Sequence, residues 1–209
     1  APCCMPAAWA WACPRTRSGS DVDGGNGAHP VPGEVFRGLA GHLPTGVSVV
    51  VALVDVEPFA AAAGSVTAAS WEPPLLAVFL RSDSRMAAAL DRSERFSVNI
   101  LGETDAGFAR RFARPGRGQG WAALADVAVV RRDPAPPILR AAVAWADCLV
   151  TRAISTGDHT CYVGEVIDLH RRAEDDPLVY HRGRFRGLGP AVAPADWAAV
   201  DAGELAATW

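Results

Sequence analysis

The sequence predicts a mainly β protein, an antiparallel barrel with short helices, and three observations favour that class. Strand-like apolar segments follow one another along most of the chain, and only short helical segments separate them. A doubly wound parallel sheet would need a full-length crossover helix after each strand, so an antiparallel arrangement fits better. Half of the 209 residues are hydrophobic, which is enough to bury a substantial core.

The chain length suits one domain with a tail at each end, since a domain usually spans about 100–200 residues. Residues 1–32 are rich in proline, glycine, serine and aspartate without any periodicity, and we expect a disordered N-terminal arm there. Residues 33–189 make up the expected domain. Residues 190–209 are the expected C-terminal tail, compatible with a helix capped near Asp196.

The composition limits which binding partners and which cellular compartment we expect for this protein. A net charge of −3 gives no reason to expect nucleic acid or a membrane surface as a partner, and no apolar run approaches the about 20 residues of a membrane-spanning helix. The five cysteines, Cys3, Cys4, Cys13, Cys148 and Cys161, are odd in number and unevenly spread, which favours reduced thiols in a cytoplasmic protein. All 20 basic residues are arginine, which indicates a GC-rich, bacterial coding sequence.

The first elements follow from periodicity and turn signals, taken in chain order. Residues 34–43 place their apolar side chains on one side of a short helix, and residues 45–56 predict a buried β-branched strand. Residues 65–82 predict two strands, the second opened by a pair of prolines where proline is tolerated. A helix is then expected within residues 82–96, capped by one of the polar residues at 82–84.

The later elements alternate in the same way. Residues 96–102 predict a strand, and residues 103–116 predict a second helix with Phe108 and Phe112 on one face. Pro115 and Gly116 end that helix. Three long β-like stretches complete the barrel, at residues 138–155, 161–172 and 177–188.

The junction between the second strand within residues 65–82 and the helix within residues 82–96 suggests an anion site. Free N–H groups and the positive end of the dipole attract anions at a helix N-terminus. Ser82 and Ser84 add hydroxyl donors there, and Arg81 and Arg85 add positive charge. Ordinary N-capping would also explain the serines, and Asp83 opposes an anion.

Two further segments suggest ligand contacts. The small side chains of residues 67–70 would let a flat ligand approach the backbone, although small residues at a strand end also serve packing alone. Arg110 and Arg114 are four residues apart and share a helix face, which suits a polyanion. A solvated basic face explains the same spacing.

The segment TGDHTCYVGEV, residues 156–166, places an aspartate, a histidine and a cysteine within four positions. Gly157–Asp158 is a turn signal, and a strand that starts near His159 would put His159 and Cys161 on one face and Tyr162 on the other. A zinc site would lack further ligands at suitable spacing, and a thiol in an apolar strand packs as a small hydrophobe. Hydrolase, Walker A and GxGxxG motifs are absent from the sequence.

Taken together and in order, these segments resemble the flavin reductase-like, FMN-binding split-barrel family. The matching segments are residues 43–50, 66–80, 81–84, 96–101, 108–116, 157–166 and 177–189. The resemblance covers about residues 34–189. It implies a six-stranded antiparallel split β-barrel, usually a homodimer, with the flavin near the subunit interface.

The resemblance implies an NAD(P)H:flavin oxidoreductase that transfers hydride from NADH or NADPH to FMN or FAD and supplies reduced flavin to a partner monooxygenase. His159 is the expected catalytic residue on the nicotinamide side, and no metal site is expected. The resemblance implies that the flavin ring system and ribityl chain contact Thr67, Ala68, Ala69 and Ser70. The flavin phosphate is expected at Ser82 and Ser84, with Arg81 and Arg85 beside them. The remaining expected cofactor-binding residues are Phe112 and Arg114 over the flavin, Gly157 and Asp158 next to His159, and Tyr180 and Arg184 at the edge of the site.

The chain also departs from the family pattern. Ala69 stands where a second serine or asparagine is frequent, Trp71 where phenylalanine is usual, and Arg85 where threonine is frequent. The lysine-containing element after the second helix is replaced by GQGW, and residues 57–64 are expected to be a loop without the family's polar turn. Two alternatives therefore stay open: a non-catalytic flavin-binding module, and a flavoprotein whose tightly bound FMN reduces another acceptor.

Overall fold

The computed structural model describes residues 29–172 and 176–190. The expected N-terminal arm up to residue 28, with Cys3, Cys4 and Cys13, and the expected C-terminal tail from residue 191 lie outside the described residues. The chain divides into two compact units, residues 1–37 and residues 38–209. The helix α1 Gly33–Ala40 confirms the first helix predicted from the sequence.

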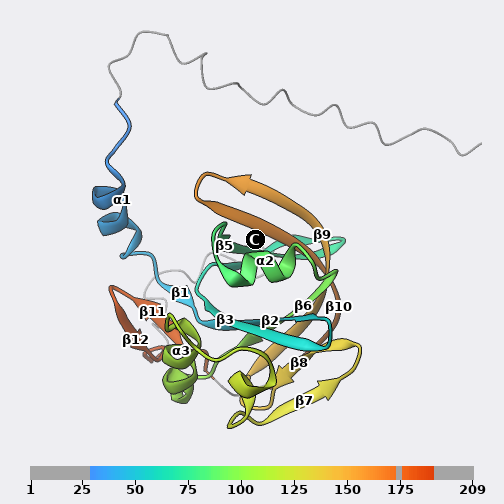
Figure 1. The fold of residues 1–209 in the computed structure, drawn as a ribbon. Helices are drawn as coiled ribbons and strands as arrows, with labels where there is room; N and C mark the ends of the chain where they lie inside the picture. Colours follow the sequence, from blue (N-terminus) through green and yellow to red (C-terminus); the bar gives the residue numbers. More distant parts are fainter. Residues whose placement is uncertain (1–28, 173–175, 191–209) are drawn as a thin grey trace, which may run out of the picture. The chain divides into compact units, whose positions relative to one another are not determined.

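Within the described residues, a seven-stranded sheet forms the centre of the second unit, with the strand order β3-β2-β6-β9-β10-β5-β4 (Figure 1). Its strands are β2 Ser48–Val54, β3 Glu57–Ala63, β4 Val66–Trp71, β5 Pro74–Arg81, β6 Arg95–Ile100, β9 Ala144–Thr156 and β10 His159–Arg171. Every neighbouring pair is antiparallel. The mainly β, antiparallel class is confirmed, and the sheet has one strand more than the expected six.

Smaller elements surround this sheet. The described ones are β1 Thr45–Gly46 with β11 Val179–His181 and β12 Arg184–Arg186, the pair β7 Val129–Arg132 and β8 Ala135–Leu139, the helices α2 Arg85–Leu90 and α3 Ala106–Ala113, and the 3-10 helices η1 Glu103–Asp105 and η2 Gly120–Leu124. None of the described helices has the length and apolar character that crossing a membrane requires.

Two sequence expectations about these elements were too coarse, and a third agrees with the structure. The stretch 138–155 is two strands, because β8 ends at Leu139 and β9 begins at Ala144. The stretch 177–188 is a hairpin of β11 and β12, turned at Arg182 and Gly183, both with positive φ. The stretch 161–172 belongs to one strand, β10, which begins at His159 as the turn signal before it predicted.

The expectation of a loop at residues 57–64 was wrong, because residues 57–63 form the edge strand β3. It pairs with β2 in full register from Val54↔Glu57 to Ser48↔Ala63. The connection is a two-residue turn, Asp55–Val56, in which both residues have positive φ, as in a type I′ hairpin. Valine is unusual at such a position, so the sequence carries little signal for this hairpin.

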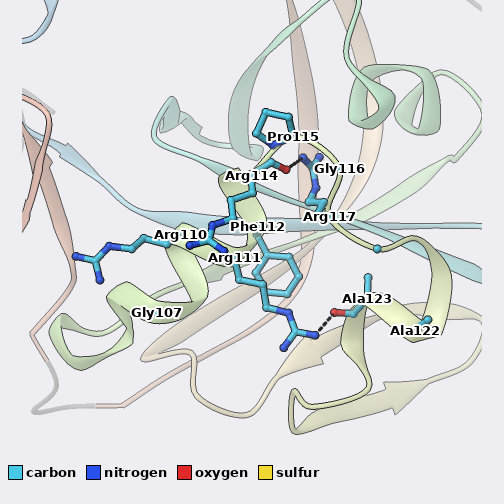
Figure 2. Close-up of a pocket in the computed structure, with 11 residues that line it drawn as sticks. Gly107, Arg110, Arg111, Phe112, Arg114, Pro115, Gly116, Arg117, Ala122 and Ala123 are labelled. Atoms are coloured by element: carbon cyan, nitrogen blue, oxygen red, sulfur yellow. Dashed lines mark hydrogen bonds between the residues drawn. The ribbon is translucent and has the colours of Figure 1, made fainter.

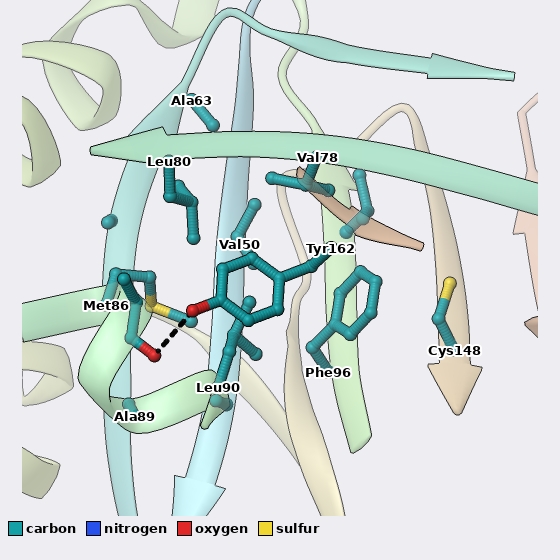
Figure 3. Close-up of a cluster of buried hydrophobic side chains, with 14 of the residues drawn as sticks. Val50, Ala63, Val78, Leu80, Met86, Ala89, Leu90, Phe96, Cys148 and Tyr162 are labelled. Carbon is teal, nitrogen blue, oxygen red and sulfur yellow. Dashed lines mark hydrogen bonds between the residues drawn. The ribbon is translucent and has the colours of Figure 1, made fainter. Parts of the chain in front are cut away.

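One hydrophobic cluster fills the space between the sheet and α2 (Figure 3). The Tyr162 ring lies there among Val50, Phe96, Leu90 and Met86. The Tyr162 hydroxyl lies 3.1 Å from the backbone oxygen of Ala87 and 2.7 Å from the Asp91 carboxylate, so this buried polar atom is satisfied at the α2 end of the core. A second cluster packs α3 and η2 against the other side of β2.

Two positions on β9 and β10 show how closely these strands approach the core. A Cβ atom added at Gly164 would lie 2.6 Å from Phe96 Cε1 and 2.8 Å from Cys148 Cβ, so only glycine fits without displacement. Cys148 and Cys161 are free, buried thiols. Burial raises the pKa of both, and that of Cys148 to about 12. Cys161 is therefore a packing residue, as its alternating apolar strand predicted.

A buried carboxylate on β9 forms ion pairs with arginines of β6 and β7. Asp147 is fully buried, and Arg95 donates to it from Nε at 2.8 Å and from Nη2 at 2.5 Å. Arg132 adds a third bond of 3.0 Å and also reaches Asp168 at 2.6 Å. Because a buried charge is costly unless it is paired and hydrogen-bonded, this network stabilises the sheet only as a complete set.

Candidate functional site

The turn between β9 and β10 positions His159. Thr156 pairs with His159 across a two-residue connection, Gly157–Asp158, and Gly157 has a φ of +76°. Glycine with positive φ at the first central position is typical of a type II′ hairpin, which matches the twist of the strands. The turn and the strand start predicted at Gly157–Asp158 and His159 are confirmed. His159 thereby pairs with Arg81, the last residue of β5.

Asp158 orients the imidazole of His159. Its carboxylate oxygen lies 2.8 Å from Nδ1, which places the Nδ1 proton between the two groups. This hydrogen bond holds the pKa of Asp158 below its usual range. The His159 side chain is 40% exposed, so Nε2 is available to a ligand. The turn at Gly157 therefore brings the Asp158 carboxylate next to the His159 ring, and that carboxylate fixes the orientation of the ring.

The segment after β5 lies against this turn. The Ser82 amide donates to the carbonyl oxygen of Asp158 at 3.0 Å, and the Ser82 hydroxyl lies 2.9 Å from the hydroxyl of Thr160. Arg81 forms a two-point ion pair with Asp83, at 3.0 and 2.6 Å. The positive charge expected from Arg81 is therefore already compensated by its neighbour.

Ser84 and Arg85 begin α2. The Ser84 hydroxyl accepts a hydrogen bond from the Ala87 amide at 3.1 Å, so the N-capping role that the sequence left open is present. Its own hydroxyl proton remains free to donate. Arg85 is exposed and donates to the carbonyl oxygen of Arg117 at 3.3 Å. Unlike Arg81, it has no carboxylate within 4.0 Å in the part of the chain that the structure describes.

The small residues of β4 form an exposed stripe at the edge of the sheet. Thr67, Ala68 and Ala69 are exposed and Ser70 is half-buried. A register shift between Ala68 and Ser70 leaves Ala69 without a partner on β5, which opens the backbone there. Thr67 pairs with Ala77 on β5, five residues before Ser82, so the stripe and the hydroxyl segment are about 16 Å apart along the strand.

The expectation that the Phe112 ring covers a ligand was wrong. Its side chain is only 1% exposed and belongs to the second hydrophobic cluster, with Leu101 and Leu139. The helix face that carries Phe108 and Phe112 turns toward the core because both side chains are apolar. Arg114, two residues later, ends α3 and is exposed.

Arg114 meets Tyr180 at a pocket between α3 and the β11–β12 hairpin. This pocket has a volume of about 490 Å³, and Val47, Ala63 and Phe185 also line it. The Tyr180 and Phe185 rings are 5.3 Å apart, and the Arg110 guanidinium lies 5.5 Å from the Phe185 ring. Arg184 is exposed on β12 and does not line this pocket. Apart from the β4 stripe, the buried Phe112 and the exposed Arg184, the predicted residues therefore fall into two groups, one around His159 and one around Arg114.

Sequence reasoning missed Arg117, which links the two groups. Its Nε donates to the carbonyl oxygen of Ala60 on the edge strand β3 at 2.8 Å, and its Nη1 donates to that of Arg114 at 3.3 Å. Burial lowers the pKa of Arg117, and the neighbouring positive charge of Arg85 lowers it further. The only sequence signal was an arginine in the glycine-rich segment RPGRGQG, which gives no hint of burial.

Comparison with known proteins assigns the family. The family model described as flavin reductase like domain matches residues 40–189, a range that contains every residue of both groups. The chain belongs to the flavin reductase family. A relative from Rhodococcus opacus, the reductase component of 4-nitrophenol 4-monooxygenase/4-nitrocatechol 2-monooxygenase, is 36% identical over 165 residues, which are 79% of this chain and 86% of the relative. An NADH-dependent FAD reductase from Streptomyces globisporus is 33% identical over 74% of this chain and 85% of its own length.

Solved structures agree with this assignment. BorF, the flavin reductase component of a bacterial two-component tryptophan halogenase, has a TM-score of 0.71 and 32% identity, over 77% of this chain and 100% of BorF. The Streptomyces globisporus NADH:FAD oxidoreductase SgcE6, solved with NAD and FAD fragments, has a TM-score of 0.70 and 31% identity, over 81% of this chain and 100% of that one. The family and fold expected from the sequence resemblance are confirmed.

Proposed function

We propose that this protein is an NAD(P)H-dependent flavin reductase, which transfers hydride from NADH or NADPH to FMN or FAD and supplies the reduced flavin to a partner monooxygenase. The observation that carries the proposal is the family match over residues 40–189, which includes the β9–β10 turn with His159. Relatives named as reductase components of monooxygenases and as NADH-dependent FMN or FAD reductases support both the reaction and the partner.

The described residues fit a flavin. The exposed stripe on β4 has small side chains and an unpaired backbone position, which suits a flat ring system lying against the strand. Ser82 and Arg85, further along β5 and into α2, offer a hydroxyl and an uncompensated positive charge at the distance of an elongated ligand's anionic end. We assign the ring system to the Thr67–Ser70 stripe and the first phosphate to Ser82, Ser84 and Arg85.

The chemistry itself belongs to the bound nucleotides: the nicotinamide C4 gives a hydride that the flavin N5 accepts. The protein contributes binding, orientation and exclusion of water. Asp158 fixes the His159 ring through Nδ1, and we assign the Nε2 side of the ring to the nicotinamide. His159 is therefore a residue that positions and polarises, and its removal should slow turnover about tenfold to a thousandfold without abolishing it.

The proposed function is tested by a grid of NADH and NADPH against FMN and FAD, following nucleotide oxidation by its absorbance. Oxidation that requires added flavin supports a reductase that releases its product. Absence of oxidation with all four combinations would contradict the proposal. Flavin that survives dialysis would favour the alternatives, a binding module if no oxidation follows, or a flavoprotein with tightly bound FMN if another acceptor is reduced.

We further propose that the protein is a homodimer and that it acts in the cytoplasm. A homodimer is proposed from the family resemblance, and light scattering of the purified protein measures it directly. A cytoplasmic location, where NADH and NADPH are available, is proposed from the two buried free thiols and the reaction class. The net charge of −3 gives no reason to propose nucleic acid as a partner of this protein.

A further inference from the structure

A pocket of about 520 Å³ between α3 and η2 gathers positive charge (Figure 2). Arg110, Arg111, Arg114 and Arg117 all line it, together with glycines and alanines. Its volume lies within the range of small-molecule sites, which is about 300–1,000 Å³. Figure 2 shows that the Arg110 side chain points away from the others, whereas Arg117 lies beside Arg114 and Gly116. The pocket is therefore strongly cationic near Arg117.

Most of this charge is uncompensated. Arg111 has a carboxylate partner, Asp126 at 3.7 Å, and a hydrogen bond of 2.8 Å to the Ala123 carbonyl oxygen. No carboxylate lies within 4.0 Å of Arg114 or Arg117 among residues 29–172 and 176–190. Arg81, Arg92, Arg95 and Arg132 have such carboxylate partners, whereas several exposed arginines of the described residues, such as Arg184 and Arg186, have none. The pocket thus carries a local excess of positive charge that an anion would stabilise.

Arg117 is the centre of this excess. It is half-buried, and its two hydrogen bonds, through Nε and Nη1, go to the neutral carbonyl oxygens of Ala60 and Arg114. Nη2 makes no hydrogen bond to the described residues. A guanidinium that is partly removed from water and faces the like charge of Arg85 is costly to keep without an anionic partner. A phosphate group matches the free edge of a guanidinium, because two of its oxygens can accept parallel N–H bonds.

Arg117 also connects the pocket to the proposed first-phosphate site. It lines both this pocket and a small cavity of about 10 Å³ with Arg85, and Arg85 donates to its carbonyl oxygen. Arg85 directly follows Ser84. A ligand that leaves the first-phosphate site past Arg85 therefore reaches Arg117 and then Arg114 at the mouth of the larger pocket.

We propose that Arg117 and Arg114 bind a second nucleotide phosphate, beyond the first phosphate of the flavin. This inference rests on the proposed function for the placement of the first phosphate. The second phosphate of FAD and the 2′-phosphate of NADPH share the required chemistry. The contact between Arg85 and Arg117 favours FAD, because its two phosphates are adjacent.

The test uses Arg117→Gln and Arg114→Gln, with Arg92→Gln as a matched control at a paired surface arginine outside the pocket. Dissociation constants for FAD and FMN and KM values for NADPH and NADH are measured for each variant. Loss of one charge-assisted hydrogen bond is expected to weaken FAD binding about tenfold to a hundredfold and to weaken FMN binding much less. A rise in the KM for NADPH alone would instead assign the site to the 2′-phosphate, and would equally support a second phosphate site.

Equal weakening of FAD and FMN, or no change in either flavin or in either nicotinamide nucleotide, would overturn the inference. Arg117 also holds β3, so thermal unfolding of each variant checks the fold. Arg114→Gln carries the test if Arg117→Gln unfolds, because the Arg114 side chain makes no hydrogen bond to the described residues. If the wild-type protein binds no flavin, the proposed function fails, while calorimetric binding of inorganic pyrophosphate to wild type and to Arg114→Gln still tests the pocket.

Discussion

Replacing Asp147 by asparagine measures how much the buried ion pair of β9 contributes to folding. The carboxylate is fully buried and accepts three hydrogen bonds, two from Arg95 and one from Arg132. The neutral amide would leave two guanidinium groups without their counter-charge and would point an N–H group toward them. Removing one partner of a buried ion pair costs about 3–5 kcal/mol. The arginine side chains are 29% and 23% exposed, so we expect about 3 kcal/mol, the lower end of that range.

A loss of this size should lower Tm by about 6–12 °C, since each kcal/mol shifts Tm by about 2–4 °C in a chain of this length. Scanning calorimetry and guanidinium unfolding measure it. The matched control is Asp55→Asn, because Asp55 pairs with Arg92 and its side chain is 82% exposed. An exposed pair contributes less than about 1 kcal/mol. A Tm for Asp147→Asn within about 2 °C of that of the control would refute the reasoning.

Two further predictions concern the packing of β9 and β10. Gly164→Ala should destabilise the protein by about 1–3 kcal/mol, because the new methyl group would meet Phe96 and Cys148; unfolding at the wild-type denaturant midpoint would contradict this. Cys148 should resist alkylation at pH 8.5 until the protein is unfolded, as peptide mass spectrometry can show. The pKa of Cys148 rises from 9.0 to about 12 on folding, so between these pH values only the unfolded thiol ionises. The free energy of unfolding should therefore fall by on the order of 1 kcal/mol per pH unit in that interval. Alkylation of Cys148 as fast in the native state as in the unfolded state would contradict this prediction.

The hairpin around His159 was predictable because its signals are local. A glycine followed by an aspartate gives the turn, and alternation along the next residues predicts His159 and Tyr162 on opposite faces of the strand. The β3 hairpin was not predictable in the same way, since Asp55–Val56 lacks a glycine or asparagine and the strand is mostly alanine. Only its pairing with β2 makes residues 57–63 a strand.

The site was predictable in outline and not in its charge balance. The resemblance proposed Ser82, Ser84 and His159 as site residues, but the ion pair between Arg81 and Asp83 depends on side-chain geometry that spacing does not reveal. Phe112 was misassigned because the resemblance placed it over the flavin, although its helical spacing with Phe108 indicated a buried face. Arg117 was missed because its burial comes from the contact of a glycine-rich segment with the edge of β3.

The most direct test of the central claim compares flavin-dependent NADH oxidation by wild type, His159→Ala and His170→Ala. His170 lies on the same strand, exposed and outside the site, next to Trp145. The proposed role of His159 predicts that His159→Ala lowers kcat/KM about tenfold to a thousandfold while flavin affinity changes little, and that His170→Ala matches wild type. Equal rates for His159→Ala and wild type would contradict the assignment of His159 to the nicotinamide side of the site.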